Sequence, residues 1–360
     1  STLLASSAAS DVYKRQTLFI LGMIFMGVTL YAQTSKKEYQ KSFDKAGITE
    51  VVLSNRYGQI DVEQKKADKI DVTATISVTA KNKSKADEFI EYIHIEDVVS
   101  GGFLNVETTF GKDVFFKQLL SGLEINIVYK VVLPYGMKLR IINTEGNVFI
   151  NNFEGDLAID IKNGNFQLGK MKDGVLQILQ SGGNFVVDDV NTLNGQFKDC
   201  NLKIEKVREA KLNLEKCTGN LATAAKLNIT SQNGELDLGE IEEMSGTANS
   251  TKFEIQDLGN ELSMTMRFGE INIRNIHTDF SLIQLRTNYT KVGLTFMEGA
   301  GYNLELKHNK SLKMDLPADF QLSQQPTSEK NVLVETGFIG NKKRTGKVDL
   351  EIRNGNLYIQ

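Results

Sequence analysis

The stretch that decides the fold is "DIKNGNFQLGK", residues 160–170. Alternating apolar residues run into Asn163-Gly164, and the alternation resumes after this pair. The pattern is typical of two strands joined by a tight corner, because Asn and Gly accept positive φ at low cost. A relative of this stretch returns about every eighteen residues through half of the chain. We therefore expect Gly164 to adopt positive φ.

The repeat has the form apolar-x-apolar-x-x-apolar. Its first members are Val148, Phe166, Phe185, Leu202, Leu236, Phe253 and Ile271. The step from one member to the next is nearly constant, except for one double step that spans a degenerate copy at Leu221. A second apolar strand precedes most copies, as in Leu157-Ile159-Ile161. One unit is therefore a strand, a corner and another strand.

Such units must stack, because one unit of about eighteen residues cannot bury its inward row of side chains alone. A nearly constant unit length favours parallel pairing of each strand with its copy one unit later, and disfavours independent hairpins. Units paired two by two would also approach the length of a propeller blade, which is the minor alternative. The sequence predicts an all-β, elongated parallel β-helix (β-solenoid), in which Phe185 points into the core.

The repeats cover residues 134–360, and residues 43–133 follow the same pattern with insertions. Residues 84–93, "SKADEFIEYI", have the apolar spacing of a helix, and residues 113–120, "DVFFKQLL", predict a second short helix or an apolar loop. We interpret 43–133 as capping coils that cover an otherwise unpaired strand edge. Residues 317–347 are less regular and are expected to form a solvated loop.

The N-terminal region has the pattern of a secretion signal. Residues 17–32, "TLFILGMIFMGVTLYA", form a sixteen-residue apolar run behind Lys14 and Arg15, and end at a small residue. This predicts a signal peptide, with an uncleaved anchor as the alternative. Residues 1–16 comprise a sequence-assembly scar and the charged n-region. The mature chain is expected to be exported, periplasmic or at the cell surface or secreted, without a transmembrane span.

Composition excludes some functions. The chain has 42 Lys plus Arg against 45 Asp plus Glu, which gives no basic surface for nucleic acid.

The two cysteines, Cys200 and Cys217, are separated by one repeat period, so we expect them to be neighbours on adjacent units. Such neighbours lie within reach of a disulfide, but two buried thiols in a core column are equally consistent with the spacing.

An enzymatic site would require carboxylates that converge from neighbouring units. The best candidates are Asp188 and Glu205 in one outward column and Asp189 in the next, but basic residues are interspersed, as on an ordinary solvated face. The three histidines, His94, His277 and His308, are isolated and predict no zinc site. We therefore predict no catalytic, cofactor-binding or metal-binding residues and no cofactor.

The order of elements resembles a family of bacterial exported β-solenoid proteins of unknown function, usually labelled "putative adhesins". The shared features are an early strand with Asn55, Gly58, Ile60 and Val62, a second strand with Ile70, Val72 and Ala74, a Pro-led strand at 131–150 and the Asn-Gly repeats. The resemblance implies export and a right-handed parallel β-helix, and it supplies no catalytic motif. The chain departs from the family where other pairs replace Asn-Gly, such as Asp199-Cys200 and Phe268 after Arg267, and wider corners are expected there.

These features predict an exported, non-enzymatic scaffold, an adhesin or envelope-associated binding surface whose partners are envelope glycans or other envelope proteins. Flat repetitive faces suit extended partners, because contacts can recur along the axis. Two alternatives stay open: a carbohydrate-active β-helix enzyme, either lyase or hydrolase, and a purely structural envelope protein.

Overall fold

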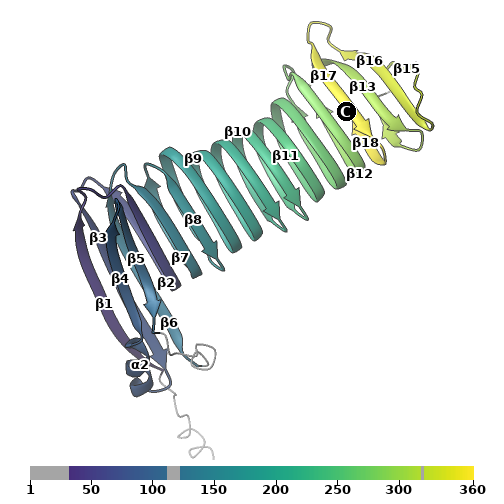
Figure 1. Cartoon of the computed structure of the whole chain (residues 1–360). Coiled ribbons are helices and arrows are strands. Elements are labelled where there is room, and N and C mark those ends of the chain that lie inside the picture. Colours follow the sequence, from purple (N-terminus) through teal and green to yellow (C-terminus); the bar gives the residue numbers. More distant parts are fainter. Residues whose placement is uncertain (1–31, 112–121, 318–319) are drawn as a thin grey trace, which may run out of the picture.

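The computed structural model describes residues 32–111, 122–317 and 320–360, and it is all-β with a long, mostly parallel sheet (Figure 1). The predicted signal peptide and the segment 113–120 lie outside the described residues, apart from Ala32. The elements are β1 (Gln33–Asp44), β2 (Glu50–Lys65), β3 (Lys69–Ala80), α2 (Lys83–Ile90), β4 (Ile93–Ser100), β5 (Phe103–Phe110), β6 (Glu124–Pro134), β7 (Lys138–Phe153), β8 (Leu157–Lys162), β9 (Phe166–Glu215), β10 (Thr218–Gln232), β11 (Glu235–Ile276), β12 (Leu282–Phe296), β13 (Gly301–Asn309), β14 (Lys313–Asp315), β15 (Ser323–Gln325), β16 (Val332–Gly340), β17 (Gly346–Ile352) and β18 (Gly355–Ile359).

Successive repeat units pair in parallel and in register. Thr218 lies opposite Asn201 on one side and Glu235 on the other, each one repeat period away. The first strands of the units, such as 210–215 and 227–232, form what we call the leading face. The second strands, such as 201–207 and 218–224, form the trailing face. The prediction of stacked parallel units is therefore confirmed.

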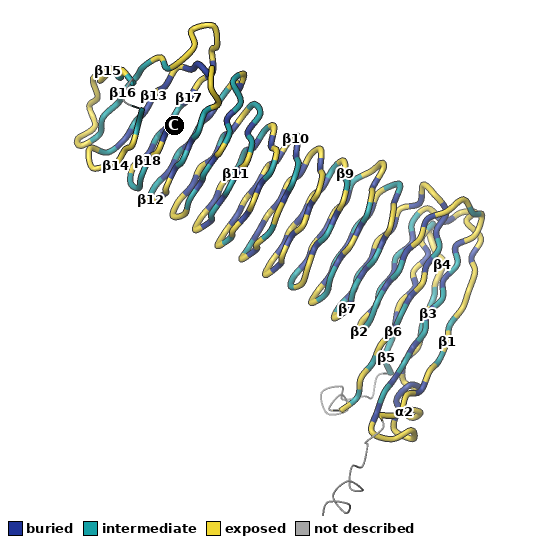
Figure 2. The backbone as a smooth tube through the Cα atoms, turned by 180° about the vertical axis from the view of Figure 1, so that it is seen from behind, coloured by how far each residue is buried: buried dark blue, intermediate teal, exposed yellow. Residues whose placement is uncertain are grey.

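The inward rows of both faces form one continuous core. Buried and exposed residues alternate along the strands, as period two requires, and the buried positions recur from unit to unit (Figure 2). Phe185 is fully buried, and its ring stacks on Phe166 with centroids 5.5 Å apart, which confirms its predicted inward orientation. Each unit is stabilised by burying its row against the rows of its two neighbours.

The prediction that Gly164 adopts positive φ is wrong. Positive φ belongs to the residue before it, Asn163, whose φ is 56°. A Cβ atom on Gly164 would lie 1.8 Å from the carbonyl oxygen of Gly146 in the preceding unit. Glycine is needed there because stacked corner backbones approach closely, not because of its own φ. The corners without Asn-Gly are not wider, since φ is 50–54° at Asp199, Lys216, Ser250, Phe268 and Tyr289.

The N-terminal end of the stack changes from parallel to antiparallel pairing. β2 pairs in parallel with β7, which lies far along the chain, and on its other side with β5 and β6. β3 pairs antiparallel with β6, β1 with β3, and β4 with β5. The outer strands β1 and β4 are bridged by side chains: the Tyr39 hydroxyl donates to Asp97 Oδ1 at 2.9 Å.

The predicted helix in this region exists, although it is shorter than expected. α2 spans Lys83–Ile90 and begins after Asn82, whose Oδ1 accepts a hydrogen bond from the Lys85 amide at 2.9 Å. Its buried residues, Ala86, Phe89 and Ile90, face β1 and β3. Ile93, predicted as helical, instead starts β4. In the part of the chain that the structure describes, no helix is long and apolar enough to cross a membrane.

At the C-terminal end, the spatial order of strands departs from the sequence order. β17 pairs in parallel with both β12 and β13, and β18 pairs with both β12 and β14. The last strands of the chain are therefore inserted between strands that precede them. The region 317–347, expected to be a loop, contains β15 and β16, which extend β13 by antiparallel pairing.

Candidate binding groove

The acidic residues considered from the sequence do not form a convergent site. Asp188 and Glu205 are exposed, and Asp189 is half-buried. Glu205 Oε1 lies 2.9 Å from Lys203 Nζ, and the charge of Asp188 acts on the same lysine. None of these carboxylates lines the hollow described below. Their arrangement is that of a charge-paired surface.

Cys200 and Cys217 are neighbours on adjacent units, as predicted, and both are buried free thiols. A hydrogen bond from the Cys200 thiol lowers the pKa of Cys217 to about 7. The same contact, together with burial, raises the pKa of Cys200. The pair thus occupies a core column at the corner. Over the described ranges, no group of three or more His, Cys, Asp or Glu side chains is placed to hold a metal ion.

The leading face carries a hollow of about 700 Å³ that extends over β7, β8, β9 and β10. Because side chains alternate along a strand, every second residue here points outward. The outward positions are rich in amides, and we call the hollow the amide groove, defined by Gln177, Leu179, Asn194, Gln196, Asn213 and Asn228. Charged side chains also line it: Arg140, Asp160 and Lys211.

A glycine lies at the centre of the groove. The inward positions of neighbouring units hold Ile178 and Leu212, but the matching position, one repeat period from either, is Gly195. The Phe197 ring occupies the space of the missing side chain, because a Cβ on Gly195 would lie 2.2 Å from Phe197 Cε2. The Phe197 side chain thus fills the core beneath Gly195. At this point the groove passes over a residue that has no inward side chain of its own.

The amides of the groove have free hydrogen-bonding capacity. Among the described residues, the side chains of Gln177, Asn194, Gln196 and Asn213 have no hydrogen-bond partner, and only Asn228 is engaged, donating to Ser245 Oγ at 2.9 Å. The three charged side chains are equally without an ion-pair partner in the described ranges. An amide offers two donor hydrogens and an acceptor oxygen, so this surface presents both functions at neighbouring positions.

A second column of amides, on the trailing face, behaves differently. Asn147, Asn165, Asn184 and Asn201 follow the corners of successive units and bond to one another, and we call them the asparagine ladder. Asn147 Oδ1 accepts from the Asn165 backbone and side-chain nitrogens at 3.0 and 2.9 Å. Asn165 Oδ1 accepts from both nitrogens of Asn184 at 2.9 Å. The ladder therefore ties units together and leaves little for a ligand.

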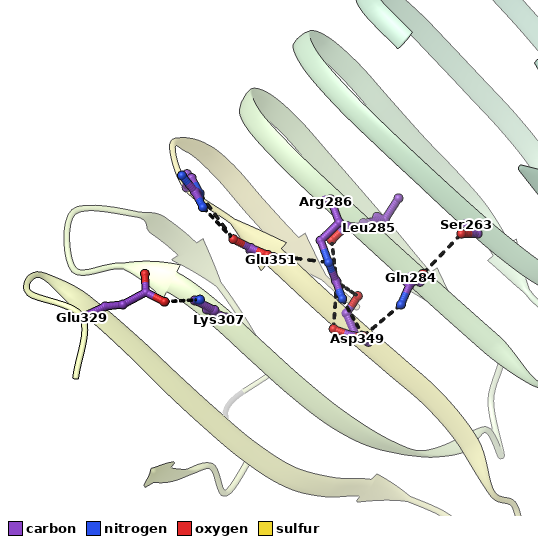
Figure 3. A network of polar contacts seen from close by, with 9 residues as sticks. Ser263, Gln284, Leu285, Arg286, Lys307, Glu329, Asp349 and Glu351 are labelled. Atoms are coloured by element: carbon purple, nitrogen blue, oxygen red, sulfur yellow. Dashed lines mark hydrogen bonds and ion pairs between the residues drawn. The ribbon is translucent and has the colours of Figure 1, made fainter. Parts of the chain in front are cut away.

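The C-terminal part of the leading face is occupied by paired charges (Figure 3). Arg286 binds Asp349 through two hydrogen bonds, both of 2.8 Å, and its Nε lies 3.6 Å from Glu351 Oε2. These hydrogen bonds lower the pKa of Asp349 below its usual value. Gln284 Nε2 adds a bond of 3.1 Å to the same carboxylate. The network joins β12 to the inserted strand β17.

Sequence reasoning missed the groove because only the columns of the second strands were compared. Aligning the outward positions of the first strands, Gln177, Asn194 and Asn228, would have shown the amide enrichment. The neighbouring column, with Leu179, Gln196 and Asn213, carries the same signal.

No family model and no curated protein matches the chain. Solved structures do. One from Bacteroides fragilis, described as a "putative adhesin", is 14% identical, with a TM-score of 0.33, over 73% of this chain and 98% of its own. A "putative adhesin" from Parabacteroides merdae is 15% identical, with a TM-score of 0.36, over 73% and 97%. A "putative lipid binding protein" from Parabacteroides distasonis is 13% identical, with a TM-score of 0.35, over 73% and 97%. Structures described as adhesins are thus among those to which the chain is similar, as its motifs indicated.

Proposed function

We propose that the chain is an exported, non-enzymatic scaffold that binds an extended partner, an envelope glycan or another envelope protein, through the amide groove. In this proposal the repeats form a right-handed parallel β-helix of about eighteen residues per coil. Residues 17–32 direct export to the periplasm or beyond the cell, and residues 43–133 and 323–340 terminate the two ends of the stack.

One observation carries the binding role: amides without protein partners recur in register along a hollow face. A solvated face normally alternates opposite charges, as the trailing face does with Lys252 placed 3.4 Å from both Glu235 and Glu254. In the groove, by contrast, the outward column between the unpaired cations Arg140 and Lys211 holds no charged side chain. Its volume falls within the range of about 300–1,000 Å³ that is usual for ligand sites.

Retention and cleavage on a polysaccharide array, together with pull-down of purified envelope proteins, test the proposal. We expect retention without cleavage, and loss of retention in the double variant Gln177→Ala/Asn194→Ala. The matched control is Gln167→Ala/Asn220→Ala, which removes two exposed amides from the trailing face. Retention that the groove variant leaves intact would contradict the assignment to this face.

Cleavage would favour the enzymatic alternative. Products that disappear in Asp188→Asn or Glu205→Gln would replace the scaffold proposal with a carbohydrate-active enzyme. Export has its own measurement: mass spectrometry of the protein recovered from the periplasm or medium should show a chain that begins after Ala32. A full-length chain held in the membrane fraction would instead support the anchor.

A further inference from the structure

We infer that the partner of the amide groove is a neutral polysaccharide that lies along the stacking axis with one sugar opposite each repeat unit. This inference rests on the proposed function and specifies the ligand of the same site. Its starting point is the registered pairing of the units: Arg140 lies opposite Ala158, Ala158 opposite Gln177, and Lys211 opposite Asn228.

The spacing of the groove matches a glycan better than a peptide. Paired strands lie about 4.7–4.9 Å apart, so the outward side chains repeat at that interval along the axis. A pyranose residue in an extended chain advances by a closely similar length. An extended polypeptide advances by about 3.2–3.4 Å per residue and would lose register within a few units.

The chemistry of the groove points the same way. Sugar hydroxyls are donors and acceptors at once, as the amides are, and each amide can satisfy two neighbouring hydroxyls. An added peptide strand would instead need unpaired backbone groups at a sheet edge. The strands under the groove have none to offer, because each pairs on both sides. Leu179, which is 50% exposed, supplies an apolar surface for the C–H face of a sugar ring.

The groove has too few cations to pair with a polyanion along its whole length. The lining contains two cations, Arg140 and Lys211, and one carboxylate, Asp160. Its net charge is therefore about +1 over its whole length. The positions between the two cations in the same column are Ala158, Gln177 and Asn194, none of which is charged. A polymer with a carboxylate on every sugar would therefore place most of its charges against neutral side chains.

Calorimetry with oligosaccharides of increasing length tests the inference. The groove spans six units, whose outward residues in one column are Arg140, Ala158, Gln177, Asn194, Lys211 and Asn228. We expect the dissociation constant for one neutral series among gluco-, manno- and xylo-oligosaccharides to fall with each added sugar, level off near six sugars, and change little with salt. Oligogalacturonates and an extended polar peptide are the charged and polypeptide probes.

Two deletions measure the register directly. Removing residues 194–210 takes one whole unit out of the groove, so the length at which affinity levels off should fall by one sugar. Removing residues 235–251, one unit outside the groove, should leave it unchanged. Should a shortened chain fail to fold, point variants replace it: Asn194→Ala, at the centre, should weaken binding of four sugars and longer, whereas Asn228→Ala, at the end, should weaken only the longest chains.

The outcomes separate this inference from the proposed function. Binding of oligogalacturonate or of the peptide in place of every neutral series overturns the inference but keeps the groove as a binding site. A neutral series whose affinity does not depend on length, or which both point variants weaken equally, overturns the one-sugar register. Absence of binding by every probe, together with no retention on the array and no envelope protein captured in the pull-down, overturns both.

Discussion

The asparagine ladder and the amide groove contain the same functional group in the same repeated arrangement, yet one is closed and the other open. In the ladder every member is Asn, so neighbours are equal in length and each oxygen meets the next side-chain nitrogen at 2.9–3.4 Å. In the groove Gln, Asn and Lys succeed one another in one column, so neighbouring side chains differ in length and do not pair. Uniformity along a column therefore stabilises the stack, and variation leaves groups free for a ligand.

Among substitutions that test this comparison, we expect the largest loss of stability at Gly164, which precedes the ladder residue Asn165. Gly164→Val would force side-chain atoms into the Gly146 carbonyl and separate the units that the ladder joins. We expect the free energy of unfolding to fall by about 3 kcal/mol or more, measured by urea denaturation. Gln167→Val, at an exposed position of β9, the strand that follows this corner, is the control. Equal stability of both variants would show that the corners do not approach closely.

A smaller effect separates the two columns directly. Asn165→Ala removes the acceptor of two hydrogen bonds from Asn184 and should cost about 1–2 kcal/mol. Gln177→Ala, in the groove, should change the free energy of unfolding by less than about 0.5 kcal/mol, because its side chain has no partner to lose. Comparable losses in urea denaturation would contradict the distinction between paired and free amides.

The smallest effect concerns the charged end of the leading face. Because Arg286 lowers the pKa of Asp349, this carboxylate stabilises the fold fully above its unfolded pKa of about 3.9, and the contribution is lost as pH falls through the lower folded value. Asp349→Asn should therefore be less stable than the parent at pH 7, by less than about 1 kcal/mol since Arg286 is partly exposed, and the difference should be smaller at pH 2. Thermal melts at both pH values measure it, and a difference that is equally large in acid would rule out the ion pair as its source.

The sequence predicted the stack well, because period-two burial and constant unit length are both local properties. It did not resolve which residue of Asn163-Gly164 takes positive φ, since both types accept that conformation. The strand order at the two ends of the stack could not be predicted from the sequence, because it depends on pairings between distant segments, such as β2 with β7 and β17 with β12. The groove was missed because outward side chains do not set the period-two pattern, so the amide columns of the first strands, with Gln177 and Asn194, were not compared.

The insertion of β17 and β18 has a consequence for how the molecule is made. During synthesis, β12, β13 and β14 emerge before β17, which lies between β12 and β13, and before β18, which lies between β12 and β14. The stack therefore cannot be completed in the order of synthesis, because its last step places β17 and β18 between strands that were made before them. A chain cut short before Gly346 leaves the backbone groups of β12 without their partner at the very position where another copy could join. β17 and β18 thus complete the pairing of β12, and the stack closes only when both strands are present.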